Sequence, residues 1–226
     1  MIKIKTKEIP IYFLTTGKNE KRRNHILEIF KDYNITEVNP LLGISRFKSG
    51  AIGMSRIIDI GLRNQDRKKQ FQPFLLVEDD VSFYREIPDE FEIPEDSDLF
   101  YLGISRCGSI HDKDTNLIFA KDYNQNIVRI FNMLSCHGIL IASALGASLY
   151  QRCMTEAYYK NKSWDLPLSH CQKFYKCYAF KKPFFYQDKN YKGQEYFTKF
   201  TLEEYIDKNY PTFDNCTDSI KFVKTN

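Results

Sequence analysis

Three consecutive carboxylates, Glu78, Asp79 and Asp80, are the residues of this sequence best suited to chemistry. They follow the uncharged run 73–77, which opens with a proline and continues with four large apolar residues. Such a run indicates a buried strand of a parallel sheet. Because open α/β sheets bind ligands beyond the carboxyl ends of their strands, we expect the three carboxylates to face a ligand there.

Three adjacent negative charges repel one another, so the cluster is costly unless a cation or several hydrogen-bond donors lie beside it. Carboxylate oxygens suit hard cations such as Mg²⁺ and Mn²⁺. Side chains alternate along an extended segment, so Glu78 and Asp80 are expected to face one way and Asp79 the other. The simplest alternative is an acidic turn that ends a strand and binds nothing. These eight residues alone do not distinguish that turn from a cation site, so other parts of the sequence are needed.

Composition narrows the class of protein. The chain has 226 residues, of which 42% are hydrophobic and 27% charged, as is typical of one large globular domain. The net charge of +4 favours an anionic ligand, but no stripe of Lys and Arg indicates a nucleic-acid groove.

The six cysteines form no C-x-x-C pair, so neither a zinc site nor a redox dithiol is indicated. No signal peptide and no apolar run of membrane-spanning length is evident, and we expect a cytoplasmic protein with reduced thiols and no membrane span.

Strand and helix patterns alternate along the chain. Strands are predicted at 9–14, 35–38, 73–77, 99–103, 127–134, 137–142 and 179–186. Helices are predicted at 18–33, 57–62, 143–159, 168–178 and 202–209, with a loop over 47–55 and polar loops over 86–98 and 105–126. This alternation predicts a Rossmann-like α/β domain over 1–210, with a mixed, mostly parallel sheet of about six strands flanked by helices, and a C-terminal tail over 211–226.

Four ordered blocks of the chain resemble family 25 glycosyltransferases, which are related to lipopolysaccharide and collagen galactosyltransferases. They are Ile11-Tyr12-Phe13-Leu14 with the following Lys21-Arg22-Arg23, the segment 50–56, the segment 75–81, and His137-Gly138 with the later Trp164-Asp165-Leu166-Pro167. The order and spacing match the family over about 180 residues. Two positions depart from its pattern, because Leu14-Thr15 replaces Asn-Leu and Ser55-Arg56 replaces Ser-His, so no histidine role is carried over to position 56.

The resemblance implies a GT-A fold and a metal-dependent transfer of a sugar from a nucleotide-diphosphate sugar, most simply a UDP-hexose, to a glycan or glycoprotein acceptor. The acidic triplet then corresponds to the family's DXD-type motif. Asp80 becomes the direct ligand of Mn²⁺ or Mg²⁺, Glu78 a water-mediated or outer ligand, and Asp79 a partner of ribose or sugar hydroxyls. The cation would act as a Lewis acid on the departing diphosphate.

The same resemblance suggests how the donor is held. Thr15 and Thr16 lie in the turn after the first strand, where this fold seats the base. Arg22, Arg23 or Arg56 could meet the phosphates, because a guanidinium binds phosphate through two parallel hydrogen bonds. Arg22 and Arg23 could equally belong to a solvated helix face.

Other candidate residues come from the fourth block and the last strand. Asp165 is a candidate general base, or an acid that binds the acceptor with Trp164 as a stacking platform; its alternative is a helix N-cap. His137 is a candidate third metal ligand or a hydrogen-bond partner of the donor, and its alternative is a buried structural histidine. Asp188 follows the last strand and could also reach the metal. His25 is taken as structural.

Two other functions remain open. A nucleotidyltransferase would need a first loop rich in glycine and lysine to hold a triphosphate, and the loop here has a single glycine, Gly17. An inactive or non-enzymatic carbohydrate-binding relative would not need the acidic triplet, so its presence favours an enzyme without excluding such a protein.

Overall fold

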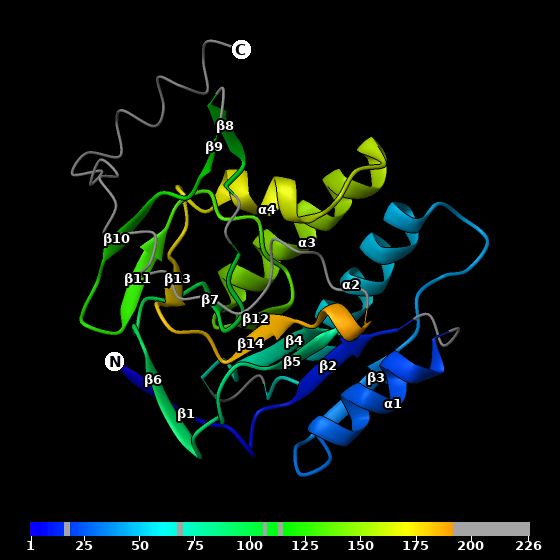
Figure 1. The fold of residues 1–226 in the computed structure, drawn as a ribbon, viewed down its shortest axis with the longest axis horizontal. Helices are drawn as coiled ribbons and strands as arrows, with labels where there is room; N and C mark the ends of the chain where they lie inside the picture. The colour runs from blue at the N-terminus through cyan, green and yellow to red at the C-terminus, as the bar shows by residue number, and fades with distance from the viewer. Residues whose placement is uncertain (16–18, 67–69, 106–107, 113–114, 192–226) are drawn as a thin grey trace.

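The apolar run before the acidic triplet forms β4 (Phe74–Glu78), a central strand of an eight-stranded sheet (Figure 1). The computed structural model describes residues 1–15, 19–66, 70–105, 108–112 and 115–191. In spatial order the sheet contains β10 (Ala120–Asp122), β11 (Ile127–Ile130), β13 (Cys177–Phe180), β7 (Leu99–Tyr101), β12 (Gly138–Ile141), β4, β2 (Ile11–Leu14) and β3 (Ile35–Val38).

Six of these eight strands run in one direction, and β11 and β12 run against them. Three neighbouring pairs are therefore parallel and four antiparallel, so the sheet is mixed, as predicted, but larger than the six strands expected. Because β2, β3 and β4 are parallel neighbours, their carboxyl ends lie side by side at one edge. That edge carries Thr15, Asn39 and the acidic triplet.

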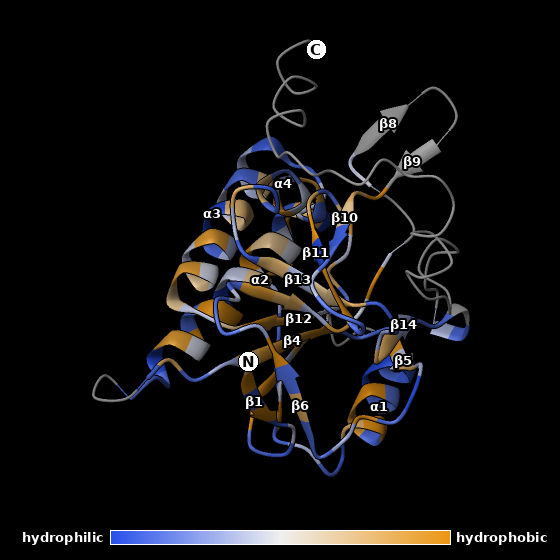
Figure 2. Ribbon diagram, turned by 90° about the vertical axis from the view of Figure 1, so that its left-hand side faces the viewer, coloured by the Kyte–Doolittle hydropathy of each residue, from blue (hydrophilic) through white to orange (hydrophobic). Residues whose placement is uncertain are grey.

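Helices cover one face of the sheet more fully than the other (Figure 2). The first face is covered by α2 (Arg46–Arg63), α3 (Ala144–Lys160) and α4 (Asp165–Cys171). The second is covered by α1 (Glu20–Ile29) and by two-stranded ribbons, β1 (Ile2–Lys5) with β6 (Glu90–Ile93) and β5 (Val81–Phe83) with β14 (Phe185–Gln187).

The residues of β4 alternate between the two faces, as expected for a strand buried on both sides. Phe74 and Leu76 pack in the core beneath α2 and α3, whereas Leu75 and Val77 pack in the core beneath α1. All four side chains are almost completely buried. The alternation assigns the next residue, Glu78, to the face covered by α2, α3 and α4.

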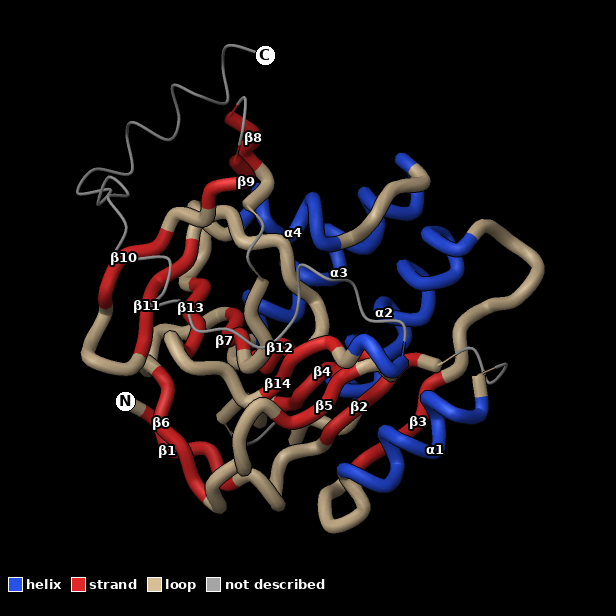
Figure 3. Tube along the Cα trace, viewed as in Figure 1, coloured by secondary structure: helices blue, strands red, loops and turns tan. Residues whose placement is uncertain are grey.

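The segment predicted as a loop over 47–55 is helical, and α2 begins at Arg46 beside α3 (Figure 3). That prediction was wrong because two glycines were interpreted as loop residues. A side chain at Gly50 would overlap the ring of Trp164, and a side chain at Gly53 would overlap Leu14. The glycines therefore allow α2 to approach its neighbours closely, and Ser45 caps the helix by accepting a hydrogen bond from the Lys48 amide.

The predicted last strand over 179–186 is two strands. β13 joins the large sheet, whereas β14 pairs with β5, directly after the acidic triplet. The polar stretch over 105–126 also contains strands, namely β8 (Ile110–Asp112), β9 (Thr115–Leu117) and β10. A short 3₁₀ helix, η1 (Lys189–Tyr191), follows β14.

Some predictions fall outside the described residues. They are the helix over 202–209, the domain boundary at 210 and the tail over 211–226. Within the described ranges, none of the helices has both the length and the apolar character needed to cross a membrane.

Candidate active site

The acidic triplet lies where β4 ends and turns into β5. Glu78 is the last residue of β4, and Asp79 and Asp80 form the turn. The turn is held from outside by β14, because Gln187 pairs with Val81 and the Asp188 amide donates to the Asp80 carbonyl at 2.8 Å. Hydrogen bonds with β14 and the residue after it therefore fix the backbone of the turn that carries Asp80.

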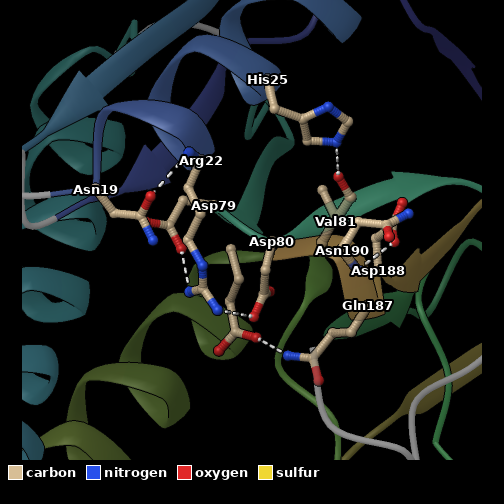
Figure 4. A network of polar contacts seen from close by, with 10 residues as sticks. Asn19, Arg22, His25, Asp79, Asp80, Val81, Gln187, Asp188 and Asn190 are labelled. Carbon is tan, nitrogen blue, oxygen red and sulfur yellow. Dashed lines mark hydrogen bonds and ion pairs between the residues drawn. The ribbon is translucent and has the colours of Figure 1, made fainter. Parts of the chain in front are cut away.

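Arg22 joins two of these carboxylates (Figure 4). Its Nη1 lies 2.9 Å from Asp79 Oδ1, and its Nη2 lies 3.1 Å from Asp80 Oδ2. Asn19 caps α1 by accepting a hydrogen bond from the Arg22 amide at 3.2 Å, so the first turn of this helix positions the guanidinium. Arg22 was one of three candidates for the donor phosphates. In this structure it supplies positive charge to two of the clustered acids, and its role towards the phosphates stays a prediction.

Burial makes this site electrostatically costly. It raises the pKa of Glu78 to about 8, with the charge of Asp80 adding to the effect and the amide of Gln187 opposing it. Burial also raises the pKa of Asp80 to about 6, although Arg22 opposes that shift and Arg46 does so more weakly. Arg46, at the start of α2, was not singled out from the sequence. An additional cation would relieve the cost of ionising both carboxyl groups.

Several buried polar atoms of the site lack a hydrogen-bond partner among the described residues. They are Oδ1 of Asp80, Nε of Arg22 and Oε1 of Gln187. A buried polar group without a partner costs about 1–3 kcal/mol. Such groups at the carboxyl edge of an α/β sheet therefore suggest that a ligand completes the site.

A divalent metal fits this donor set in part. Glu78 at the end of β4 and Asp80 in the turn that follows offer carboxylate oxygens two residues apart, and Oδ1 of Asp80 has no partner among the described residues. Among all the residues that the structure describes, no group of three or more His, Cys, Asp or Glu side chains is arranged so that it could hold a metal ion. Mg²⁺ and ions like it are commonly bound by one or two carboxylates, with substrate phosphates and water as the other ligands. The residues present suit that kind of site.

Gln187 is the main residue that sequence reasoning missed. Its Nε2 donates to Glu78 Oε2 at 2.6 Å, and its side chain is buried. Its position could not be foreseen, because it depends on the separate pairing of β14 with β5. The neighbouring Asp188 does not join the acids. Its Oδ2 instead accepts from Ser82 Oγ at 3.0 Å and Tyr186 Oη at 3.3 Å.

His25, taken as structural, secures the turn from the side of α1. Its Nε2 lies 2.9 Å from both the Val81 carbonyl and Ser82 Oγ, and its ring stacks on Tyr191 with 3.9 Å between centroids. These contacts connect α1, β5 and η1, so they support the structural role.

Asp165 lies at the same edge of the sheet on the opposite face from α1. It is the first residue of α4, whose N-cap is Trp164 and has no side-chain cap bond. Asp165 is therefore not the N-cap residue. Its charge contributes to raising the pKa of Glu78 and also that of the Cys136 thiol. The structure thus brings Asp165 within electrostatic range of the triplet, and the Trp164 ring rests against Gly50 of α2.

His137 is completely buried. Its ring occupies the space that a side chain at Gly103 would need, and Ser135 Oγ lies 3.3 Å from its Nδ1. Burial lowers the pKa of His137 to about 3, so the ring is neutral. This environment favours the structural alternative stated for His137, while its role towards a donor stays a prediction.

Two of the remaining residues predicted to contact the donor, Thr15 and Arg56, have backbone partners at the end of β3 and just beyond it. Thr15 is buried, and its amide donates to the Val38 carbonyl at 3.3 Å. Thr16 lies outside the described residues. Arg56 is exposed on α2, and its Nη1 donates to the Asn39 carbonyl at 3.3 Å. Its assignment to the phosphates stays a prediction.

Comparison with models of known protein families found no match to this chain, and comparison with curated proteins found none either.

The raised pKa of Glu78 leads to a prediction about stability in metal-free buffer. Between the ordinary pKa of 4.5 and about 8, the folded protein keeps a proton that the unfolded chain releases, so stability falls as pH rises through this window. Glu78→Gln cannot ionise and removes this loss. We expect the variant to gain free energy of unfolding relative to the wild type on going from pH 5 to pH 8, measured by urea denaturation with chelator present.

The control is Glu92→Gln, at an exposed position of β6. Its free energy of unfolding, compared with the wild type, should change little between the two pH values. A stability difference for Glu78→Gln that is the same at pH 5 and pH 8 would show that Glu78 ionises normally in the folded protein.

Proposed function

We propose that the chain is a metal-dependent glycosyltransferase that transfers a sugar from a nucleotide-diphosphate sugar, most simply a UDP-hexose, to a glycan or glycoprotein acceptor. The observation that carries the proposal is the partly buried acidic triplet at the carboxyl end of β4, where burial raises the pKa of Glu78 and of Asp80. One oxygen of Asp80 has no partner among the described residues, and Arg22 lies beside it. This arrangement suits a ligand that brings both a cation and phosphate oxygens.

Glu78 and Asp80 would hold the cation. A bound Mn²⁺ or Mg²⁺ would supply Lewis-acid stabilisation of the departing diphosphate. Arg22 has a flat guanidinium whose two terminal nitrogens contact two different acids, Asp79 and Asp80, and a guanidinium of this kind also matches phosphate. We infer that Arg22 holds the carboxylates together before the donor binds and shares its charge with the diphosphate afterwards.

Asp165 would act on the acceptor. In a displacement that inverts the anomeric centre, the acceptor hydroxyl attacks from the face opposite the diphosphate, and its proton needs a base. Asp165 is partly exposed and lies across from α1, which carries Arg22. Trp164, the residue before it, supplies an apolar ring on which a sugar could stack.

The proposal is tested by calorimetry with UDP. We expect binding in the presence of Mn²⁺ that weakens sharply when chelator is added, and weaker binding of GDP and CMP than of UDP. Equal affinity for UDP with and without chelator would contradict the metal assignment, and equal affinity for all three nucleotides would contradict the preference for uridine. A panel of UDP-sugars, followed by release of UDP, then identifies the donor. Binding of UDP without hydrolysis or transfer of any sugar would favour an inactive relative.

A further inference from the structure

Two cysteines that the proposed function does not use lie in contact between α3 and α4. Cys153 Sγ is 3.8 Å from Cys171 Sγ. Cys153 is buried on α3, with 1% of its surface exposed, whereas Cys171 is the last residue of α4 and is partly exposed. One thiol is therefore accessible to a reagent, and the other lies directly behind it.

The surroundings make the two thiols unequal. The hydrogen bond donated by Cys153, helped by the charges of Arg152 and Lys173, lowers the pKa of Cys171 to about 7. The same contact raises the pKa of Cys153, as does its burial. Because the thiolate is the reactive form, Cys171 should react first and Cys153 should remain a thiol beside it. Cys136 and Cys177 are buried, which raises the pKa of each thiol, so they should stay inert.

We propose that Cys153 and Cys171 are an oxidation site that closes to an intramolecular disulfide when the protein meets a peroxide. The Cys171 thiolate attacks one peroxide oxygen, the O–O bond breaks, and Cys171 becomes a sulfenic acid, while the departing hydroxide takes up a proton and becomes the first water. The Cys153 sulfur then attacks the Cys171 sulfur, and the S–O bond breaks as the S–S bond forms. The Cys153 proton leaves with the hydroxyl group as water. Two thiols are oxidised, and hydrogen peroxide is reduced to two waters.

The geometry allows this closure with a small movement. The sulfur atoms must approach from 3.8 Å to about 2.05 Å, and both are carried by helices that pack against each other. The new bond would join α3 to the end of α4. Because α4 begins at Asp165, directly after Trp164, the bond would also restrict the helix that carries the proposed acceptor side of the site.

The test exposes the purified full chain to hydrogen peroxide, alkylates the remaining thiols under denaturing conditions and digests the protein with trypsin without reduction. We expect a cross-linked peptide that joins residues 153–160 to residues 163–173 and disappears on treatment with dithiothreitol. Peptides with Cys136 or Cys177 should be fully alkylated. The oxidised protein should unfold at a temperature roughly 5 °C or more above that of the reduced protein.

Two variants make the result specific. Cys153→Ser should leave Cys171 as a sulfenic acid that dimedone traps, and Cys171→Ser should leave Cys153 as an alkylated thiol. The proposal is overturned if wild-type Cys171 oxidises to sulfinic acid while Cys153 stays alkylated, or if either residue pairs with a different cysteine. Because mass spectrometry reads the bond directly, this outcome does not depend on whether the chain transfers sugars.

Discussion

Asp80→Asn is expected to weaken binding of UDP in Mn²⁺ by at least about tenfold and to make the remaining binding insensitive to chelator. Asn has nearly the same shape as Asp, and its oxygen can still accept a hydrogen bond from Nη2 of Arg22, which lies 3.1 Å from Asp80 Oδ2. The substitution removes the negative charge and leaves one neutral amide oxygen in place of a carboxylate, so the side chain binds a hard cation less strongly. Even residues that only support metal ligands contribute about 10–100-fold to metal affinity, so loss of a direct ligand should cost no less.

The fold should survive this substitution. An ionised Asp80 is opposed by burial and by its acidic neighbours, so a neutral side chain relieves rather than creates strain. Asp89→Asn is the matched control, because Asp89 is exposed. Among the described contacts its carboxylate pairs only with Lys7, and its backbone carbonyl accepts a hydrogen bond from the Thr6 amide. It should bind UDP as the wild type does. If Asp80→Asn keeps the full Mn²⁺ dependence, the cation is held elsewhere and Asp80 serves only to pair with Arg22.

The central part of the fold could be predicted because its signals are local. The apolar run before Glu78 indicated a buried strand that ends in the acids, and β4 ends at that residue. The strand over 35–38 is likewise confirmed by β3. In both segments the apolar pattern and the residues that end it lie within a few positions of one another, so a single window contains the whole signal.

The partners of the acids could not be predicted, because they come from distant parts of the chain. Arg22 lies 57 positions before Asp79 in the chain, and Gln187 lies 109 positions after Glu78. The amide of Gln187 is in place only because the last predicted strand divides and β14 crosses to β5. Lys181-Lys182-Pro183 does interrupt the apolar pattern of 179–186, and a proline there indicates a break in the strand, but this local signal does not reveal that the second half pairs with β5.

The prediction of a loop over 47–55 was wrong for a different physical reason. Glycine destabilises an isolated helix by about 1 kcal/mol relative to alanine, and that propensity favoured a loop. In the folded protein, Gly50 and Gly53 instead let α2 pack against Trp164 and Leu14, and tertiary packing outweighs the intrinsic preference. This close packing also brings Trp164, and with it the start of α4, toward the carboxyl edge of the sheet.

Asp165→Asn is expected to lower the rate of sugar transfer by roughly two to four orders of magnitude while donor binding is retained, as is usual when a catalytic base is lost. Asn keeps the size of the side chain but cannot take a proton from the acceptor hydroxyl. Asp165 lies close enough to Glu78 for its charge to contribute to that residue's raised pKa, yet it stands on α4, away from the helix that carries Arg22. Calorimetry with UDP and Mn²⁺, followed by transfer assays with the identified donor, separates binding from chemistry.

A structural role for Asp165 would give a different result. A carboxylate in the first turn of α4 stabilises the folded protein by about 0.3–1 kcal/mol through the helix dipole. Removal of the Asp165 charge should therefore lower the melting temperature slightly. Normal transfer together with earlier melting would therefore reduce Asp165 to a stabilising residue. Glu156→Gln, in the last part of neighbouring α3, controls for loss of a carboxylate that pairs only with Lys160 among the described contacts.

If the product retains the anomeric configuration of the donor, the base role also fails, because the acceptor would not attack from the face opposite the diphosphate. Asp165 would then serve to orient the acceptor, and its replacement should raise KM for the acceptor more than it lowers kcat.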